Sequence, residues 1–146
     1  MNRRTFALAL ALLGSTLFAT GCANMAASST AATTSKVVIQ VSDGDAVKWN
    51  LALNNAKNVQ HDLGADKVNI EIVAFGPGID MLTADSTVAD RVSAAVKSGI
   101  QVAACENSMA AKKLTKTDMN PSIGYVPSGV VEIMRREQQG WSYLRP

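Results

Sequence analysis

Short, nearly continuous hydrophobic runs recur along the chain and are separated by longer stretches of mixed polarity. Most of these runs are rich in Val, Ile and Ala, which is typical of strands buried on both faces of a sheet. The alternating sequence WSYLR near the C-terminus is more typical of an edge strand. The pattern therefore predicts five strands, at residues 37–41, 68–75, 100–104, 123–126 and 141–145.

Between the predicted strands, apolar residues recur every three or four positions, which places them on one face of a helix. The longest such stretch is 46–63, where Trp49 and Leu53 share one stripe and Gly64 provides a helix end. The same spacing predicts three further helices, one capped by Ser86 or Thr87 and closed by Gly99, one at 107–114, and one running from Ser128 to Gly140.

Several polar residues on these helices need an interpretation. Three asparagines spaced four residues apart, beginning at Asn50, lie on a face that is either solvated or an oligomer contact. On the last helix, Glu132 is expected to pair with Arg136 one turn later. Arg135 and Arg136 are otherwise expected on a solvated face.

The alternation of strand and helix over residues 36–146 is typical of an α/β domain with right-handed crossovers. We therefore predict a Rossmann-like or flavodoxin-like fold, with a mainly parallel sheet of about five strands and helices on both faces. Functional groups in such folds gather at the carboxyl ends of the strands. Three segments are expected there, namely Ser42-Asp43-Gly44, Gly76-Pro77-Gly78 and Cys105-Glu106-Asn107.

The first 22 residues have the pattern of an export signal. Arg3 and Arg4 precede the apolar run FALALALL at 6–13, which is shorter than the roughly 20 residues of a membrane span. The string NRRTF at 2–6 resembles a twin-arginine signal, although an ordinary secretory signal also carries arginines here. Both interpretations predict export to the periplasm of a bacterium.

Cys22 follows the small residues Ala19-Thr20-Gly21, and this sequence resembles the lipobox of bacterial lipoproteins, although Ala19 stands where that motif usually has Leu. The resemblance implies that Cys22 is lipidated and anchors the protein to the membrane. The alternative is ordinary cleavage nearby, which leaves a free protein. Residues 23–35 contain 11 Ala, Ser or Thr among 13 residues, a composition typical of a flexible linker. The folded domain is therefore expected at 36–146.

Charge and motifs exclude several functions. The chain has 14 basic and 12 acidic residues, but Arg3 and Arg4 lie in the predicted signal, so the rest is balanced. A neutral domain has no electrostatic basis for binding nucleic acid or an anionic lipid surface. The chain contains neither GxGxxG nor GxxxxGK[ST], so no nucleotide or other cofactor is expected. No metal is expected either, because Asp43 and Asp45 on one turn more often cap a helix.

Cys105 has the clearest chemical potential in the domain. It follows a predicted buried strand and precedes a predicted helix, whose first amides and dipole favour a thiolate. Glu106 opposes this effect if its carboxylate points the same way. His61 is expected at the other end of the sheet, which argues against a Cys–His hydrolytic pair. The alternative interpretation of Cys105 is a small hydrophobic residue packed at the end of a strand.

Several segments resemble the DsrE/DsrF-like family of small sulfur-relay proteins. They are WNLALNNAKN at 49–58, AFGPGI at 74–79, VAACENSM at 102–109, VPSGVVEIMRREQQGW at 126–141 and the ending WSYLRP. The resemblance covers most of residues 36–146 and implies a Rossmann-like domain that assembles as trimers or hexamers. It also implies a mechanism in which one cysteine carries sulfane sulfur as a persulfide.

Cys105 occupies the position of the sulfur-carrying cysteine in this resemblance. The residues expected around its sulfur are Asn107, Ser108, Gly76, Pro77, Gly78, Ser42 and Asp43. The first hypothesis is therefore a periplasmic persulfide carrier or sulfurtransferase that uses Cys105. The second is a non-catalytic oligomeric binding module in which Cys105 is structural. The known relays act in the cytosol, so export of this chain implies other sulfur donors and acceptors.

Overall fold

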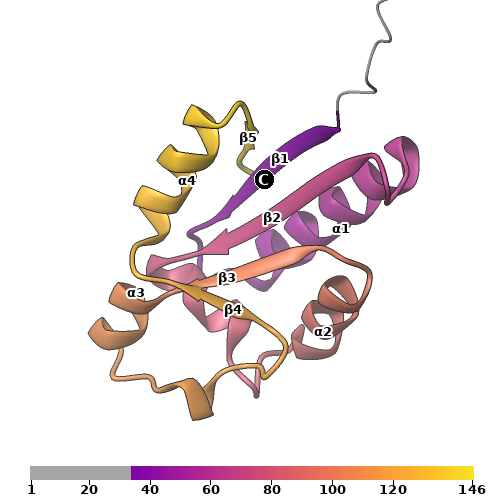
Figure 1. The fold of residues 1–146 in the computed structure, drawn as a ribbon. Coiled ribbons are helices and arrows are strands. Elements are labelled where there is room, and N and C mark those ends of the chain that lie inside the picture. The colour runs from indigo at the N-terminus through magenta and orange to yellow at the C-terminus, as the bar shows by residue number, and fades with distance from the viewer. Residues whose placement is uncertain (1–33) are drawn as a thin grey trace, which may run out of the picture. The chain divides into compact units, whose positions relative to one another are not determined.

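The structure, a computed structural model, describes residues 34–146, which fold around a parallel β-sheet (Figure 1). The predicted signal peptide at 1–22, its Cys22 and all but the last two residues of the linker at 23–35 lie outside this range. Within 34–146, none of the helices combines the length and the hydrophobicity that crossing a membrane requires.

Strands and helices alternate along the chain, as the hydrophobic pattern predicts. The elements are β1 (Ser35–Val41), α1 (Ala46–Leu63), β2 (Val68–Ala74), the 3-10 helix η1 (Gly76–Leu82), α2 (Ala89–Lys97), β3 (Gln101–Cys105), α3 (Glu106–Ala111), the 3-10 helix η2 (Lys116–Asp118), β4 (Gly124–Val126), α4 (Gly129–Gln138) and β5 (Ser142–Leu144). The five strands pair in parallel in the order β4-β3-β2-β1-β5. The predicted α/β fold and the edge position of the last strand are confirmed.

Most of the hydrophobic core lies on one face of the sheet. Alternate residues of the central strands point to this face, among them Ile39, Ile72 and Val102. The helices α1 and α2 and the segment η1 cover it (Figure 1). Leu53 of α1 and Val92 of α2 are buried against these strand residues, so the predicted helical stripes face the sheet.

The helix α4 covers the other face of the sheet (Figure 1). Its Ile133 packs with Val38, Val73 and Trp141 in a second, smaller hydrophobic cluster. Helices therefore lie on both faces, as predicted, but the two layers differ in size. The smaller layer also contains the ion pair between Glu71 of β2 and Arg136 of α4.

Two helix starts differ from the predictions because tertiary contacts override local signals. The Gly-Pro-Gly segment, expected as a loop at the carboxyl edge of the sheet and not as the start of a helix, opens the 3-10 helix η1. Gly78 is needed there because a Cβ at this position would lie 2.3 Å from the carbonyl oxygen of Val41. The predicted cap of α2 at Ser86 or Thr87 is wrong, since Val88 occupies that place. Ser86 still accepts a bond from the Val88 amide at 3.4 Å.

The asparagine stripe on α1 is partly solvated, as one of the two alternatives predicted, because Asn54 and Asn58 are exposed, and two of its residues also contact α2. The guanidinium of Arg91 in α2 donates hydrogen bonds to the side-chain oxygens of Asn50 and Asn54. The predicted helix at 107–114 is also too long, because α3 ends at Ala111 and Lys113 has a positive φ of 58°.

Arg136 is not on a solvated face, in contrast to the prediction. Its guanidinium bonds to Glu71, a β2 residue that is only 3% exposed, and lies 2.9 Å from Glu132. It also lies 4.7 Å from the ring centroid of Trp141. The predicted Glu132–Arg136 pair is therefore confirmed, but it belongs to a cluster that attaches α4 to the sheet.

Replacing Arg136 by Met tests this attachment. Burial raises the pKa of Glu71 above its ordinary value, and the bond and charge of Arg136 oppose that rise. Arg136→Met leaves a buried carboxylate without its cation, so we expect unfolding free energy at neutral pH to fall by about 2 kcal/mol. The loss should shrink on acidification, because a raised folded-state pKa means that protonation favours the folded form.

Urea denaturation at neutral and mildly acidic pH measures this effect, and Arg135→Met is the matched control. Arg135 is 61% exposed and lies 3.8 Å from Glu132. Its replacement should change stability by no more than about 0.5 kcal/mol. Equal losses in the two variants, or a loss that is independent of pH, would show that Arg136 does not neutralise Glu71.

Candidate functional site

Parallel pairing brings the predicted loop segments to the carboxyl edge of the sheet. In register, Val41 of β1 pairs with Ala74 of β2, and Ala74 pairs with Ala104 of β3. The segments that follow these strands therefore emerge side by side. A direct hydrogen bond of 2.8 Å runs from the Gly76 amide to the hydroxyl of Ser108, and it joins the second segment to the third.

Cys105 is the last residue of β3 and the residue immediately before α3. Val102 and Ala104 belong to the core under α1 and α2. Because side chains alternate along a strand, Cys105 points to the opposite face, toward α4. The residue is 4% exposed. It is the free cysteine of the part of the chain that the structure describes.

Donor groups at the starts of two helices, α3 and α4, lower the pKa of the Cys105 thiol. Burial raises the pKa of this thiol, but the hydroxyl of Ser108 and the amides of Gly129, Ser108 and Asn107 outweigh it. The net effect is that the pKa of Cys105 lies below the usual thiol value. Amides at the amino ends of α3 and α4 thus stabilise the thiolate, which is the nucleophilic form.

Gly129 reaches the sulfur because it has no side chain. A Cβ at this position would lie 3.0 Å from Cβ of Phe75 and 3.2 Å from Cγ1 of Val73. The amino end of α4 is therefore packed directly onto β2, with its first amide turned toward Cys105. In the sequence, Gly129 was noted only as part of the segment VPSGVVEIMRREQQGW that resembles the family. A glycine at the first position of a helix was the available signal for this contact.

A shallow cavity of about 300 Å³ adjoins the cysteine on the α3 side. Its lining residues are Gly76, Pro77, Asn107, Ser108, Ala111 and Lys112. Four of these residues were expected around the cysteine. Ser108 links the cavity to the cysteine, since it lines the cavity, its hydroxyl accepts from the Gly76 amide, and the same hydroxyl lowers the pKa of Cys105.

Sequence reasoning missed Lys112, which brings a positive charge to this cavity. Its ammonium lies 2.5 Å from a carboxylate oxygen of Asp80 in η1. No spacing along the chain connects these two residues, because they meet only when α3 packs against η1.

The remaining expected site residues lie farther along the same edge. Gly78 is buried against the backbone of β1, and the hydroxyl of Ser42 accepts a 3.0 Å hydrogen bond from the side-chain amide of Gln40. The carbonyl of Asp43 accepts a 2.6 Å bond from the indole of Trp49. These three residues shape the loop after β1 and do not line the cavity beside Cys105.

Glu106, Asp45 and His61 each have a partner other than Cys105. The Glu106 carboxylate lies 3.4 Å from the ammonium of Lys116, so an opposite charge compensates it. Asp45, at the start of α1, caps that helix by accepting from the Val47 amide at 2.8 Å. His61 is exposed and bonds to the adjacent Asp62. Within residues 34–146, no group of three or more His, Cys, Asp or Glu is arranged to hold a metal.

Comparison with known proteins shows similarity over almost the whole domain. The sequence model of the DsrE/DsrF-like family matches residues 23–146. A protein of unknown function from Methanobacterium thermoautotrophicum, MTH1491, is 33% identical, with a TM-score of 0.73 over 77% of this chain and 99% of that one.

Two further structures share the fold at lower identity. BT1422 from Bacteroides thetaiotaomicron, of unknown function, is 16% identical with a TM-score of 0.65, over 80% of this chain and 98% of that one. The ychN protein from E. coli is 10% identical with a TM-score of 0.64, over 77% of this chain and 99% of that one. No curated protein matches the chain.

Replacing Ser108 by Ala tests the hydroxyl that faces the sulfur. The substitution removes one donor, so the pKa of Cys105 should rise and the thiolate fraction at neutral pH should fall. The pH profile of alkylation, recorded in a Cys22→Ser background, should move its midpoint to higher pH. Ser128→Ala is the control, because Ser128 makes no side-chain capping bond. An unmoved midpoint in Ser108→Ala would exclude this role.

Replacing Gly129 by Ala tests the amino end of α4. The new methyl group must displace Phe75 or move the helix, so we expect a stability loss of about 1–3 kcal/mol. The pKa of Cys105 should rise as the Gly129 amide withdraws. Gly124→Ala is the matched control, since the nearest atom to its Cβ would be at an ordinary 3.7 Å. Thiol titration and urea denaturation measure both effects, and wild-type values for Gly129→Ala would refute the contact.

Proposed function

Because the chain belongs to the DsrE/DsrF-like family, we propose that it is a sulfur carrier that uses Cys105 as its single reactive thiol. The observation that carries this proposal is the set of donors around the sulfur, which lowers the pKa of Cys105 in spite of burial. A merely structural cysteine in an apolar environment would have a raised pKa.

The proposed chemistry is thiol exchange with a persulfide. The Cys105 thiolate attacks the outer sulfur of a donor R–S–SH, forming a Cys105 S–S bond while the donor S–S bond breaks. The donor leaves as the thiolate R–S⁻, and Cys105 carries the added sulfur with its proton. An acceptor thiolate then removes that outer sulfur by the same step and regenerates the Cys105 thiolate. One cysteine suffices because no net oxidation or reduction occurs.

The cavity beside α3 supports a route for the donor. It is lined by Asn107 and Ser108 and carries the ammonium of Lys112 at its border. Ser108 lines this space and its hydroxyl also lowers the pKa of the buried thiol, which favours an approach of the donor past Ser108. The lysine favours donors that are anionic, although Asp80 offsets part of its charge.

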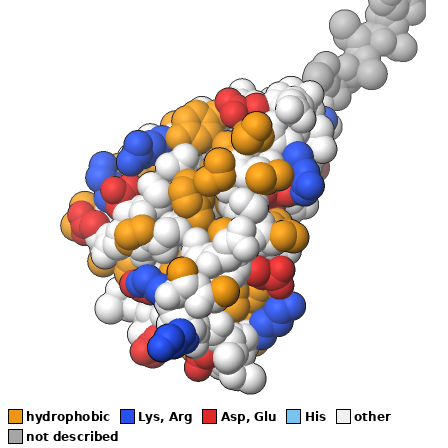
Figure 2. All heavy atoms as spheres, turned by 90° about the vertical axis from the view of Figure 1, so that its left-hand side faces the viewer, with side chains coloured by type: hydrophobic (Ala, Val, Ile, Leu, Met, Phe, Trp, Pro, Cys, Tyr) orange, Lys and Arg blue, Asp and Glu red, His pale blue; other side chains and the backbone are white. Residues whose placement is uncertain are grey.

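We also propose that the carrier works in the periplasm as a homo-oligomer. The N-terminal signal pattern supports export, and Cys22 with the small residues before it supports a lipid anchor. The family resemblance supports a trimer or hexamer. The apolar side chains Val130, Val131 and Met134 of α4 are 41–53% exposed. Figure 2 shows the side of the molecule that lies on the left in Figure 1, where several hydrophobic side chains gather at the surface. Contact between copies would cover such residues.

The burial of Cys105 favours a second candidate function. With 4% of its surface exposed, the residue also suits a non-catalytic oligomeric module in which the thiol only packs. The two functions differ in whether the folded protein lets a reagent reach the sulfur.

Polysulfide treatment followed by intact-protein mass spectrometry separates the two candidates. In a Cys22→Ser background, the folded protein should gain sulfur, because Cys105 remains and its thiolate is stabilised. The added sulfur should be released by a reductant and by an excess of a small thiol. The matched control carries both Cys22→Ser and Cys105→Ser, and it should gain none.

A folded protein that gains no sulfur, but whose Cys105 reacts after denaturation, would reject the carrier and support the structural module. Equal sulfur uptake with and without Cys105 would also reject the carrier, because the sulfur would then be bound elsewhere.

A further inference from the structure

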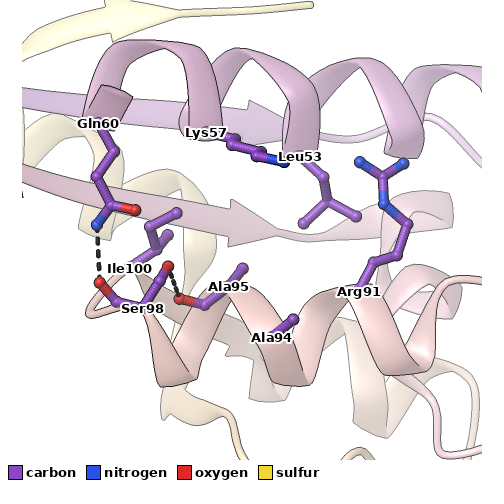
Figure 3. A pocket seen from close by; sticks show the side chains of 8 residues that line it. All are labelled: Leu53, Lys57, Gln60, Arg91, Ala94, Ala95, Ser98 and Ile100. Atoms are coloured by element: carbon purple, nitrogen blue, oxygen red, sulfur yellow. Dashed lines mark hydrogen bonds between the residues drawn. The ribbon is translucent and has the colours of Figure 1, made fainter. Parts of the chain in front are cut away.

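A cleft of about 280 Å³ lies between α1 and α2 (Figure 3). Ile100, the residue directly before β3, contributes to its lining, whereas Cys105 ends the same strand. The cleft is therefore separate from the cysteine site. Its volume is near the lower limit of about 300 Å³ for small-molecule pockets, which suits a ligand smaller than a drug.

The cleft exists because small side chains of α2 face larger ones of α1. Leu53 and Lys57 of α1 are four residues apart and so share one stripe. On α2, Ala94 and Ala95 occupy the facing positions. Two adjacent alanines cannot fill the space that α1 leaves, so an apolar hollow with Leu53 and Ala95 in its lining remains between the helices (Figure 3).

Polar contacts between the helices close both ends of this hollow. At one end, the Gln60 side chain donates a 2.8 Å bond to the carbonyl of Ser98 (Figure 3). At the other end, Arg91 of α2 bonds to Asn50 and Asn54 of α1. These bonds hold the helices at a fixed separation, so the cleft is part of the folded structure and need not be opened by a ligand.

The charges that line the cleft are both positive. Lys57 projects from α1 and Arg91 from α2, and no carboxylate is among the lining residues. Among residues 34–146, Lys57 has neither a hydrogen bond nor an ion pair to its ammonium. Lys57 is exposed, so its ammonium is free to pair with an anion at the mouth of the apolar hollow, which matches a ligand that has one negative charge and an apolar body.

The helix dipoles give this ligand a direction. The contacts of Asn50 with Arg91 and of Gln60 with Ser98 show that α1 and α2 run the same way. The carboxyl ends of both helices therefore lie at the Gln60–Ser98 end, where an anion is disfavoured. Arg91 lies near the amino end of α2, and the Lys57 side chain extends toward Leu53 and away from Gln60 (Figure 3). The negative group therefore belongs between these two side chains, and the apolar body extends toward Ile100.

We propose that this cleft binds a small organic carboxylate, with its carboxylate on Lys57 and Arg91 and a short apolar chain on Leu53, Ala95 and Ile100. A monoanion fits better than a phosphate, because Arg91 is already bonded to two asparagines and Lys57 supplies one uncommitted charge. The site does not depend on Cys105, so it stands or falls independently of the proposed sulfur carrier.

Titration of the purified full chain with hexanoate, followed by amide NMR shifts, tests the proposal. We expect saturable shifts at Leu53, Ala95 and Ile100, and binding of the uncharged analogue hexanol that is weaker by at least about threefold. Lys57→Gln should weaken the binding of hexanoate by a similar factor and leave the binding of hexanol unchanged. Lys67→Gln, at an exposed lysine outside the cleft, is the matched control and should change neither.

Ala94→Leu provides an independent test of the cavity. Leucine suits a helix, and at this exposed lining position its side chain would cover the mouth of the hollow, so hexanoate binding should be lost while the melting temperature is retained. Cys105→Ser should bind hexanoate like the wild type. The proposal is overturned if hexanoate gives no saturable shifts, if hexanol binds equally well, or if Lys57→Gln leaves hexanoate binding unchanged.

Discussion

The amino ends of two helices converge on one sulfur atom, and the proposed sulfur chemistry depends on that convergence. The helix α3 follows Cys105 directly, so its first amides lie near the sulfur by chain connectivity. The helix α4 begins 24 residues later and supplies the amide of Gly129 only because it packs on β2. Burial alone would keep the thiol protonated, and donors from both helices reverse that tendency.

The position of α4 therefore connects stability with reactivity. A glycine sets the distance between the start of this helix and the sheet, and the Glu71–Arg136–Glu132 cluster attaches a later turn. Burying a carboxylate under α4 costs free energy, as the raised pKa of Glu71 indicates. Such a cluster adds little stability, but it fixes the orientation of α4. Arg136 contacts both Glu71 and Trp141 in only one orientation of the helix.

The two layers of the sheet serve different purposes in this fold. The larger layer, under α1 and α2, contains most of the hydrophobic core and also a cleft with two cations at its border. The smaller layer, under α4, contains the cysteine and the buried ion cluster. Because side chains alternate along each strand, most of the apolar core points toward α1 and α2, whereas Cys105 and Glu71 point toward α4.

The sequence by itself determined the order of strands and helices, the parallel sheet and the place of Cys105 between β3 and a helix, because hydrophobic periodicity and glycine ends are local signals. It also paired Glu132 with Arg136, which are one turn apart. Only the tertiary structure brought Gly129 to the sulfur, Arg136 to Glu71 and Arg91 to Asn50. These partners are between 24 and 65 residues apart, and their meeting depends on how helices dock on the sheet, which no local pattern encodes.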